Sequence, residues 1–202
     1  TEHAYRQRDP ITGSLPATFD YQHTHNVFSV ADFTRRWLGL TGVAFAISTA
    51  CSSSAKAFAS AWRQMRGGLC DAAVVGGVDS LCLTTLHGFN ALGLISARPC
   101  RPWDVDRDGL NIGEAAGFAL LEWAKPNDDR VLLLGYGESS DAYHMTAAHP
   151  EGAGAALAMQ EALARAEILP AQVDYINLHG TATPLNDAAE DRAVLRVFGP
   201  DT

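Results

Sequence analysis

One cysteine in the chain stands in a setting that favours nucleophilic chemistry. Cys51 lies in a run of small residues at 48–54 (STACSSS), where an apolar run of strand length gives way to helical spacing. Small neighbours let the backbone turn sharply and let a substrate approach. The free N–H groups and the dipole of a helix N-terminus favour a thiolate. The segment is thus compatible with a nucleophilic thiol, although a single cysteine among small residues is more often a buried structural residue, which is the alternative.

A second segment, residues 175–187 (YINLHGTATPLND), places a histidine beside hydroxyl groups. His179 follows an apolar run, and Gly180 comes directly after it. Thr181 and Thr183 add two hydroxyls. Because ligands bind at the carboxyl ends of strands in open α/β folds, this segment is a candidate binding or catalytic site. The alternative for His179 is a structural role.

Two carboxylates follow on the next predicted helix. Asp187 and Glu190 are three residues apart and therefore share a helix face. Without a role in a site, Asp187 would be a favourable charge in the first helical turn and Glu190 a solvated surface residue.

Residues 101–109 (RPWDVDRDG), followed by 113–117 (GEAAG), form a dense mixture of charges. Such mixtures usually form solvated or salt-bridged loops. A calcium loop is excluded because Arg107 lies inside it and Ala115 holds the twelfth position, where an acidic ligand is required. The four cysteines form no C-x-x-C pair, so a zinc site is not expected. Phosphate-loop, dinucleotide-binding and G-x-S-x-G sequences are absent.

Apolar runs and helical repeats alternate along the chain. Runs of strand length lie at residues 43–49, 72–75, 116–123, 131–136 and 173–178. Helical spacing occurs at residues 27–38, 55–66, 86–94, 154–166 and 184–198, with Asn26 or Ser29 capping the first helix and Thr183 the last. Gly76 and Gly77 are expected to end the second strand. The pattern predicts an α/β fold with a mostly parallel, covered sheet, and an internal boundary near Pro126.

Net charge and the distribution of apolar residues exclude some classes of partner and some cellular compartments. The 202 residues carry a net charge of −8, which disfavours binding to nucleic acid. No apolar run is long enough to cross a membrane, and the N-terminus has no secretory signal. We therefore expect a cytoplasmic protein with reduced cysteines, with neither nucleic acid nor membrane as partner.

Taken together, the sequence resembles the β-ketoacyl-acyl-carrier-protein synthases, the elongating condensing enzymes of the thiolase-like superfamily. The resemblance rests on four segments in the family's order: STACSSS, RPWDVDRDG with GEAAG, DAYHMTAAHPEGAGAALAM and YINLHGTATPLNDAAE. It implies the layered αβαβα thiolase-like architecture, only partly represented. Residues 1–126 correspond to the later part of the N-terminal half, which holds the nucleophile. Residues 127–202 correspond to the start of the C-terminal half, which holds the active-site histidine.

The resemblance also implies roles for individual residues. Cys51 corresponds to the acylated nucleophile, with its own backbone N–H as an oxyanion donor. His179 corresponds to the first of two active-site histidines, which stabilise the enolate formed on decarboxylation. The other implied roles are binding of the phosphopantetheine arm by Thr181 and Thr183, lining of the acyl pocket by Phe89, and a charge network behind the site formed by Asp187 and Glu190.

The implied activity is 3-oxoacyl-[acyl-carrier-protein] synthase, a decarboxylative condensation of an acyl thioester with malonyl-acyl-carrier-protein in fatty acid, polyketide or polyene elongation. The implied partners are acyl carrier protein and a second subunit, in a homodimer or in a heterodimer with a related chain. No cofactor is implied beyond the phosphopantetheine on the carrier. Alternatives are a non-condensing partner subunit or inactive fragment that binds the carrier, and a coenzyme A-dependent thiolase.

The resemblance also shows what the 202 residues lack. The family's second histidine, its lysine and its late Gly-Phe-Gly-Gly turn do not occur. The first residue is Thr1, not an initiator methionine. We therefore expect a central fragment of an acyltransferase, inactive by itself.

Overall fold

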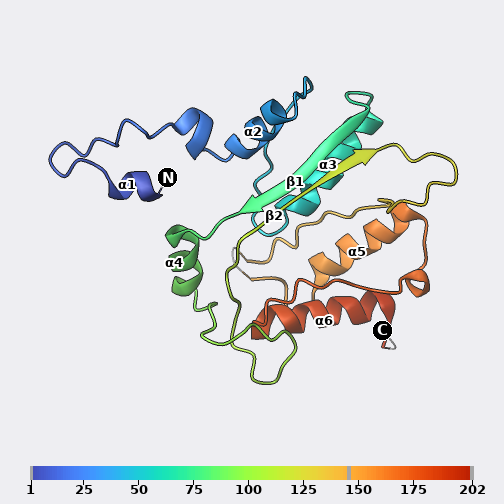
Figure 1. The fold of residues 1–202 in the computed structure, drawn as a ribbon. Coiled ribbons are helices and arrows are strands. Elements are labelled where there is room, and N and C mark those ends of the chain that lie inside the picture. Colours follow the sequence, from blue (N-terminus) through green and yellow to red (C-terminus); the bar gives the residue numbers. More distant parts are fainter. Residues whose placement is uncertain (1, 145–146, 201–202) are drawn as a thin grey trace. The chain divides into compact units, whose positions relative to one another are not determined.

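The computed structural model describes residues 2–144 and 147–200 (Figure 1). The chain divides into two compact units. Unit 1 comprises Thr1–Leu86 with Gly113–Lys125, and unit 2 comprises His87–Ile112 with Pro126–Thr202. The units are interleaved in sequence, because residues 87–112 leave the first unit to pack within the second.

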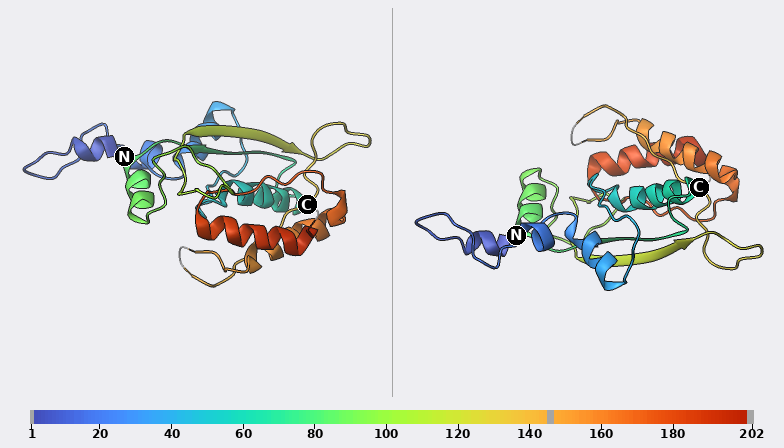
Figure 2. Two further views of the ribbon diagram at one scale, coloured as in Figure 1. Left: turned by 90° about the horizontal axis from the view of Figure 1, so that it is seen from below. Right: turned by 90° about the horizontal axis from the view of Figure 1, so that it is seen from above.

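Unit 1 is built on an antiparallel strand pair, β1 (Ala72–Asp79) and β2 (Ala115–Glu122), and on helix α3 (Ser53–Arg66), which packs against β1 (Figures 1 and 2). The helix buries Ala59, Ala61 and Met65. Two of the three are alanines, whose small side chains let the helix lie close to the sheet.

Two glycines explain how these elements approach one another. A Cβ at Gly76 would lie 2.2 Å from Cδ1 of Phe118 on β2, and a Cβ at Gly77 would lie 2.7 Å from Oγ of Ser54 at the start of α3. Both glycines lie inside β1, so the expectation that they end the strand is wrong. Glycine is required at both positions because a side chain would collide with β2 at Gly76 and with the start of α3 at Gly77.

The N-terminal part of unit 1 is a series of short elements. It contains α1 (Glu2–Arg6), the π-helical turn η1 (Tyr21–His25) and α2 (Ser29–Trp37), and α2 packs with η1. Neither expected side chain caps α2. Its N-cap is Phe28, and the side chain of Asn26 instead accepts a hydrogen bond from the Phe28 N–H at 2.7 Å.

Unit 2 centres on two helices that lie side by side, α5 (Ala153–Ala166) and α6 (Pro184–Phe198) (Figures 1 and 2). Pro184 occupies the first helical turn of α6, where its missing N–H costs nothing. The start of α5 lies close to α6, since a Cβ at Gly152 would come within 2.2 Å of the Ala189 carbonyl oxygen. The turn η2 (Pro170–Gln172) follows α5, and α4 (Leu83–Ala91) spans the boundary between the units.

The helices expected from the sequence are confirmed, and three of the strands are not. Residues 43–49, 131–136 and 173–178 form no strand. They are also not buried on both faces: Val43 and Tyr175 are 90% and 77% exposed. The only sheet in the described residues is the antiparallel pair, so the expectation of a mostly parallel sheet is wrong for this chain. An apolar run becomes a strand only when a neighbouring strand accepts its hydrogen bonds, and these runs have no such neighbour in the described residues.

Candidate active site

Cys51 lies at an exposed, tightly wound turn that leads into α3. The preceding residue, Ala50, has φ +54°, a left-handed conformation that costs a non-glycine residue about 1–2 kcal/mol. The thiol is exposed, and the helix begins two residues later at Ser53. The predicted setting of small residues at a helix start is therefore confirmed, and the alternative of a buried structural cysteine is wrong.

Hydroxyl groups hold this turn in place. The Thr49 N–H donates to Oγ of Ser53 at 2.8 Å, and the Ser53 hydroxyl donates to the Ala50 carbonyl oxygen at 2.7 Å. The Ser52 hydroxyl donates to the Thr49 carbonyl oxygen at 2.9 Å. These three bonds hold the strained Ala50 in place, so the turn that presents Cys51 is fixed by its own sequence.

His179 is held through its backbone, not through its ring. The His179 N–H donates to Oε1 of Glu190 at 2.6 Å, and the Gly180 N–H donates to Oε2 of the same carboxylate at 3.0 Å. One carboxylate on α6 thus binds two consecutive amides. Gly180 has φ +54°, which glycine adopts without strain. His179 is exposed.

The two threonines that follow are paired with each other. Oγ1 of Thr181 and Oγ1 of Thr183 lie 2.8 Å apart, so one hydroxyl donates to the other. Thr183 is the N-cap residue of α6, but its side chain makes no capping hydrogen bond. Between them, the fully buried Ala182 has φ +56°, and its carbonyl oxygen accepts the Gly109 N–H at 3.0 Å.

Asp187 is a buried charge, not a solvated one. Its side chain is 1% exposed, and Oδ2 accepts the Trp103 N–H at 3.0 Å. Nε of Arg107 lies 3.4 Å from the same oxygen. The expectation of a solvated or salt-bridged loop at residues 101–109 did not single out Trp103 and Arg107 as partners of Asp187. The only signal was the unusual Pro-Trp pair among the charges.

The structure therefore brings together five of the seven residues named from the sequence. His179, Thr181, Thr183, Asp187 and Glu190 all lie in unit 2, on α6 or in the segment leading into it. Phe89 is half-buried on α4, in the part of that helix that belongs to unit 2. Cys51 belongs to unit 1.

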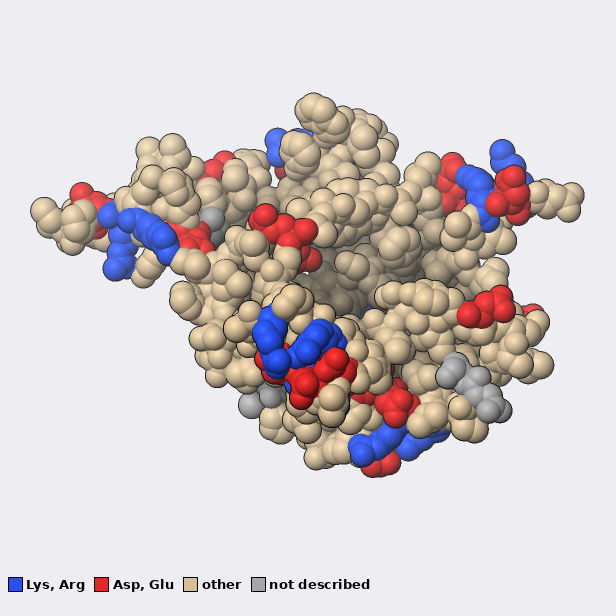
Figure 3. Space-filling model, turned by 60° about the horizontal axis from the view of Figure 1, so that its bottom comes forward, with Lys and Arg blue, Asp and Glu red and all other residues tan. Residues whose placement is uncertain are grey.

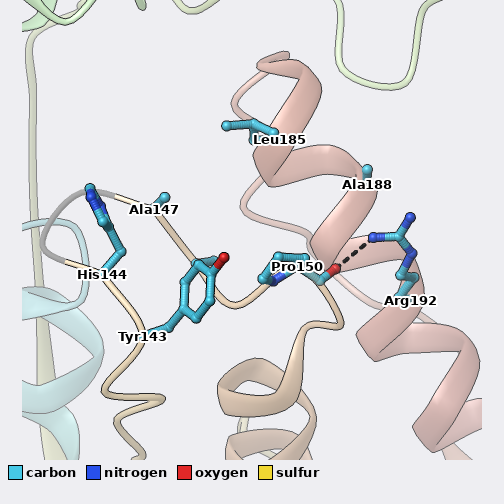
Figure 4. A pocket seen from close by; sticks show the side chains of 8 residues that line it. Tyr143, His144, Ala147, Pro150, Leu185, Ala188 and Arg192 are labelled. Carbon is cyan, nitrogen blue, oxygen red and sulfur yellow. Dashed lines mark hydrogen bonds between the residues drawn. The ribbon is translucent and has the colours of Figure 1, made fainter.

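A pocket of about 370 Å³ lies beside the first turns of α6 (Figure 4). Its walls are mainly apolar, and its lining residues are Tyr143, His144, Ala147, Ala148, Pro150, Leu185, Ala188 and Arg192. The Arg192 guanidinium donates to the Pro150 carbonyl oxygen at 2.7 Å and forms an ion pair with Glu151 at 3.8 Å. The adjoining chain is folded back by Asp141, whose carboxylate accepts the N–H groups of His149 at 2.7 Å and Tyr143 at 3.2 Å. These bonds, the His149 N–H first, lower the pKa of Asp141.

The Cys82 thiol has a lowered pKa. The Thr85 side chain, with Oγ1 at 3.1 Å from Sγ, and the Thr85 N–H lower the pKa of Cys82. This cysteine directly precedes α4, so the first turn of that helix favours the thiolate. Within the described residues, no cluster of histidine, cysteine and acidic side chains could hold a metal ion. No helix in the described part of the chain is long and apolar enough to cross a membrane.

Comparison with known proteins identifies the family. The model of the β-ketoacyl synthase N-terminal domain matches residues 20–127, and the model of the C-terminal domain matches residues 131–202. This chain belongs to the β-ketoacyl synthase family. Its fold is thiolase-like α/β, partly represented, as the resemblance implied.

Individual β-ketoacyl synthases agree with the family models. The 3-oxoacyl-[acyl-carrier-protein] synthase 2 of Vibrio cholerae is 39% identical over 173 residues, which are 80% of this chain and 42% of that protein. A ketosynthase from Xenorhabdus doucetiae, solved in complex with its chain length factor, is 42% identical with a TM-score of 0.84 over 96% of this chain and 47% of that one. A type II polyketide ketosynthase, solved in complex with its acyl-carrier protein, is 31% identical with a TM-score of 0.79 over 86% of this chain and 46% of that one. The chain thus spans slightly less than half the length of these relatives.

Proposed function

We propose that the whole protein containing this chain is a 3-oxoacyl-[acyl-carrier-protein] synthase, and that this chain supplies its nucleophile and one active-site histidine. The observation that carries the proposal is the exposed Cys51 on its hydroxyl-locked turn before α3, in a chain of the β-ketoacyl synthase family. Because Cys51 is present, we favour a condensing enzyme over a non-condensing partner subunit. The family match favours it over a thiolase.

In the first half-reaction, the Cys51 sulfur attacks the carbonyl carbon of an acyl group carried on phosphopantetheine. A C–S bond forms to Cys51, the bond to the pantetheine sulfur breaks, and the proton of Cys51 leaves with the carrier thiol. The backbone N–H of Cys51, close to the N-terminus of α3, would donate to the developing oxyanion. Ala50 fixes the direction of this N–H, since its strained conformation admits little rotation.

In the second half-reaction, a malonyl thioester loses CO₂, and the electron pair of the broken C–C bond passes into an enolate. The exposed imidazole of His179 would donate a hydrogen bond to the enolate oxygen, while Glu190 holds its backbone. The enolate carbon then attacks the acyl carbonyl on Cys51. The Cys51 thiolate leaves, and a 3-oxoacyl product two carbons longer remains on the carrier.

The hydroxyl pair of Thr181 and Thr183 would hydrogen-bond the amides of the pantetheine arm. Leu185, two residues further on, lines the apolar pocket beside α6. In the same proposal, Phe89 lines the acyl pocket, and Asp187 and Glu190 form the charge network behind the site. Residues 1–126 would be the later part of the N-terminal thiolase-like half, and residues 127–202 the start of the C-terminal half.

The proposed partners are an acidic acyl carrier protein and a second synthase subunit, identical or related, in the cytoplasm. On the face shown in Figure 3, Lys and Arg side chains lie beside Asp and Glu side chains in small clusters. In unit 1, for example, Arg35 and Arg36 both pair with Asp32, at 3.1 and 3.0 Å. An acidic carrier would bind through arginines within these mixed clusters. We therefore expect the affinity for the carrier to fall as the salt concentration rises.

The test is mass spectrometry of the whole protein after incubation with acyl carrier proteins charged with acetyl, hexanoyl or decanoyl groups. We expect the acyl mass on the Cys51 peptide, loss of the adduct in Cys51→Ala, and an unchanged adduct in the matched variant Cys70→Ala. An adduct that persists in Cys51→Ala, or its absence with all three donors, contradicts the proposal. Decarboxylation of malonyl-carrier should then fall in His179→Ala, and an unchanged rate would remove the role of His179.

A further inference from the structure

Residues 100–109 contact the His179–Thr183 segment at Gly180, Thr181 and Ala182. The Gly109 N–H donates to the Ala182 carbonyl oxygen at 3.0 Å, and Sγ of Cys100 lies 3.8 Å from the Thr181 carbonyl oxygen. The Trp103 ring fills the space beside Gly180, where a Cβ would lie 3.3 Å from Cζ3 of the ring. The segment is thus held by Glu190 on one side and by this loop on the other.

The loop itself depends on one buried carboxylate. Asp187 accepts the backbone N–H of Trp103, which has φ +62°, a conformation that a tryptophan adopts only when its surroundings require it. The carboxylate is 1% exposed. A charge this deeply buried is stable only with a counter-charge, and Arg107 stands 3.4 Å away with Nε towards it.

Arg107 joins the two parts of this arrangement. One of its terminal nitrogens donates to the Asp104 carbonyl oxygen at 2.9 Å and so fixes the loop's own turn. Its Nε is buried and makes no hydrogen bond within the described residues, so the contact with Asp187 is one of charge. Neutralising this carboxylate is therefore what the buried end of Arg107 contributes.

We propose that Arg107 is a positioning residue: by compensating Asp187, it keeps Trp103 against Gly180 and thereby fixes where the His179–Thr183 segment presents its side chains. The catalytic consequence rests on the proposed function, and the positional one does not. Loss of the counter-charge lets Asp187 turn towards water, which releases the Trp103 N–H. Gly180 and Ala182, both in left-handed conformations, then lose the surface that holds them.

The experiment compares Arg107→Met, Arg107→Lys and Arg101→Met in the whole protein. Arg101 is the matched control, because it lies in the same loop, has an equally buried and unbonded Nε, and contacts Asp104 and Asp106 but not Asp187. The first readout is amide hydrogen exchange at Trp103 and Gly109. We expect exchange at least about tenfold faster in Arg107→Met and close to wild type in Arg107→Lys and Arg101→Met.

The second readout is decarboxylation of malonyl-carrier. A displacement of about 1 Å at a catalytic group costs roughly 100-fold in rate, so we expect kcat to fall about 10- to 100-fold in Arg107→Met. KM should stay within about threefold, and Arg107→Lys should restore most of the rate. A variant that merely unfolds would lower the active fraction and would not give this rescue by charge.

The two proposals fail in different ways. Unchanged exchange at Trp103 and Gly109 in Arg107→Met overturns the positioning role, whatever the rates are. Equal effects of Arg101→Met and Arg107→Met overturn it as well. A wild-type protein that neither acylates Cys51 nor decarboxylates malonyl-carrier refutes the proposed function, and hydrogen exchange still decides the role of Arg107.

Discussion

Glu190→Gln is the substitution whose consequence the structure defines most closely. Each oxygen of the Glu190 carboxylate accepts one backbone N–H, from His179 at 2.6 Å and from Gly180 at 3.0 Å. Glutamine has nearly the same shape, but it replaces one acceptor oxygen with an NH₂ donor. One of the two amides then faces a donor and loses its partner.

The expected cost follows from these two bonds. A hydrogen bond to a charged group contributes about 1.5–3 kcal/mol, and a neutral one about 0.5–1.5 kcal/mol. The variant loses one charged bond and weakens the other to a neutral one. Since Glu190 is only partly buried, water can replace some of what is lost. We expect the His179–Gly180 segment to be destabilised by about 2–3 kcal/mol.

Amide hydrogen exchange measures this loss directly, because it reports local opening. At about 1.4 kcal/mol per factor of ten, the Gly180 amide should exchange roughly 30- to 150-fold faster in Glu190→Gln. Glu161→Gln on α5 is the matched control, since it removes an ordinary i,i+4 pair with Arg165 and should change exchange little. If the amides of His179 and Gly180 keep wild-type exchange in Glu190→Gln, the carboxylate does not hold this segment and the reasoning is refuted.

Two further predictions concern packing and pH. A Cβ at Gly137 would lie 1.7 Å from a backbone oxygen of α5, so Gly137→Ala should lower the free energy of unfolding by about 1–3 kcal/mol or more. The control is Gly88→Ala on α4, where a Cβ meets open space and the change should be neutral or slightly stabilising. Equal denaturation midpoints for the two variants would contradict the packing argument. The folded-state pKa of Asp141 lies below its unfolded value because backbone N–H groups bind the carboxylate. Its contribution to stability is therefore present above the unfolded pKa and is lost as pH falls through the folded pKa. The stability difference between wild type and Asp141→Asn should thus shrink on acidification below about pH 4, and a difference independent of pH would show that the charge plays no part.

Local sequence was sufficient for the helices and for the turn at Cys51. Helices α3, α5 and α6 follow from apolar spacing and from Pro184 and the glycines near their ends, features that act within one or two turns. The exposed turn at Cys51 likewise depends on hydroxyls no more than four residues away. Such short-range interactions can be read from consecutive residues, so these predictions were confirmed.

The strands and the support of the site could not be predicted in this way. Residues 43–49 have the composition of a buried strand, yet whether they form one depends on a hydrogen-bonding neighbour that the run itself does not specify. Gly76 resembled a strand end, but it lies inside β1 because a Cβ there would collide with Phe118, far along the chain.

By itself, the sequence determined which reactive groups the candidate site contains: the thiol of Cys51, the imidazole of His179 and the carboxylates of Asp187 and Glu190. Only the tertiary structure decided how unit 2 holds the last three. Asp187 is buried because the chain brings it a backbone N–H from Trp103, 84 positions away, and a guanidinium from Arg107. The charge of a carboxylate is a property of the residue, whereas its burial and its partners are properties of the fold.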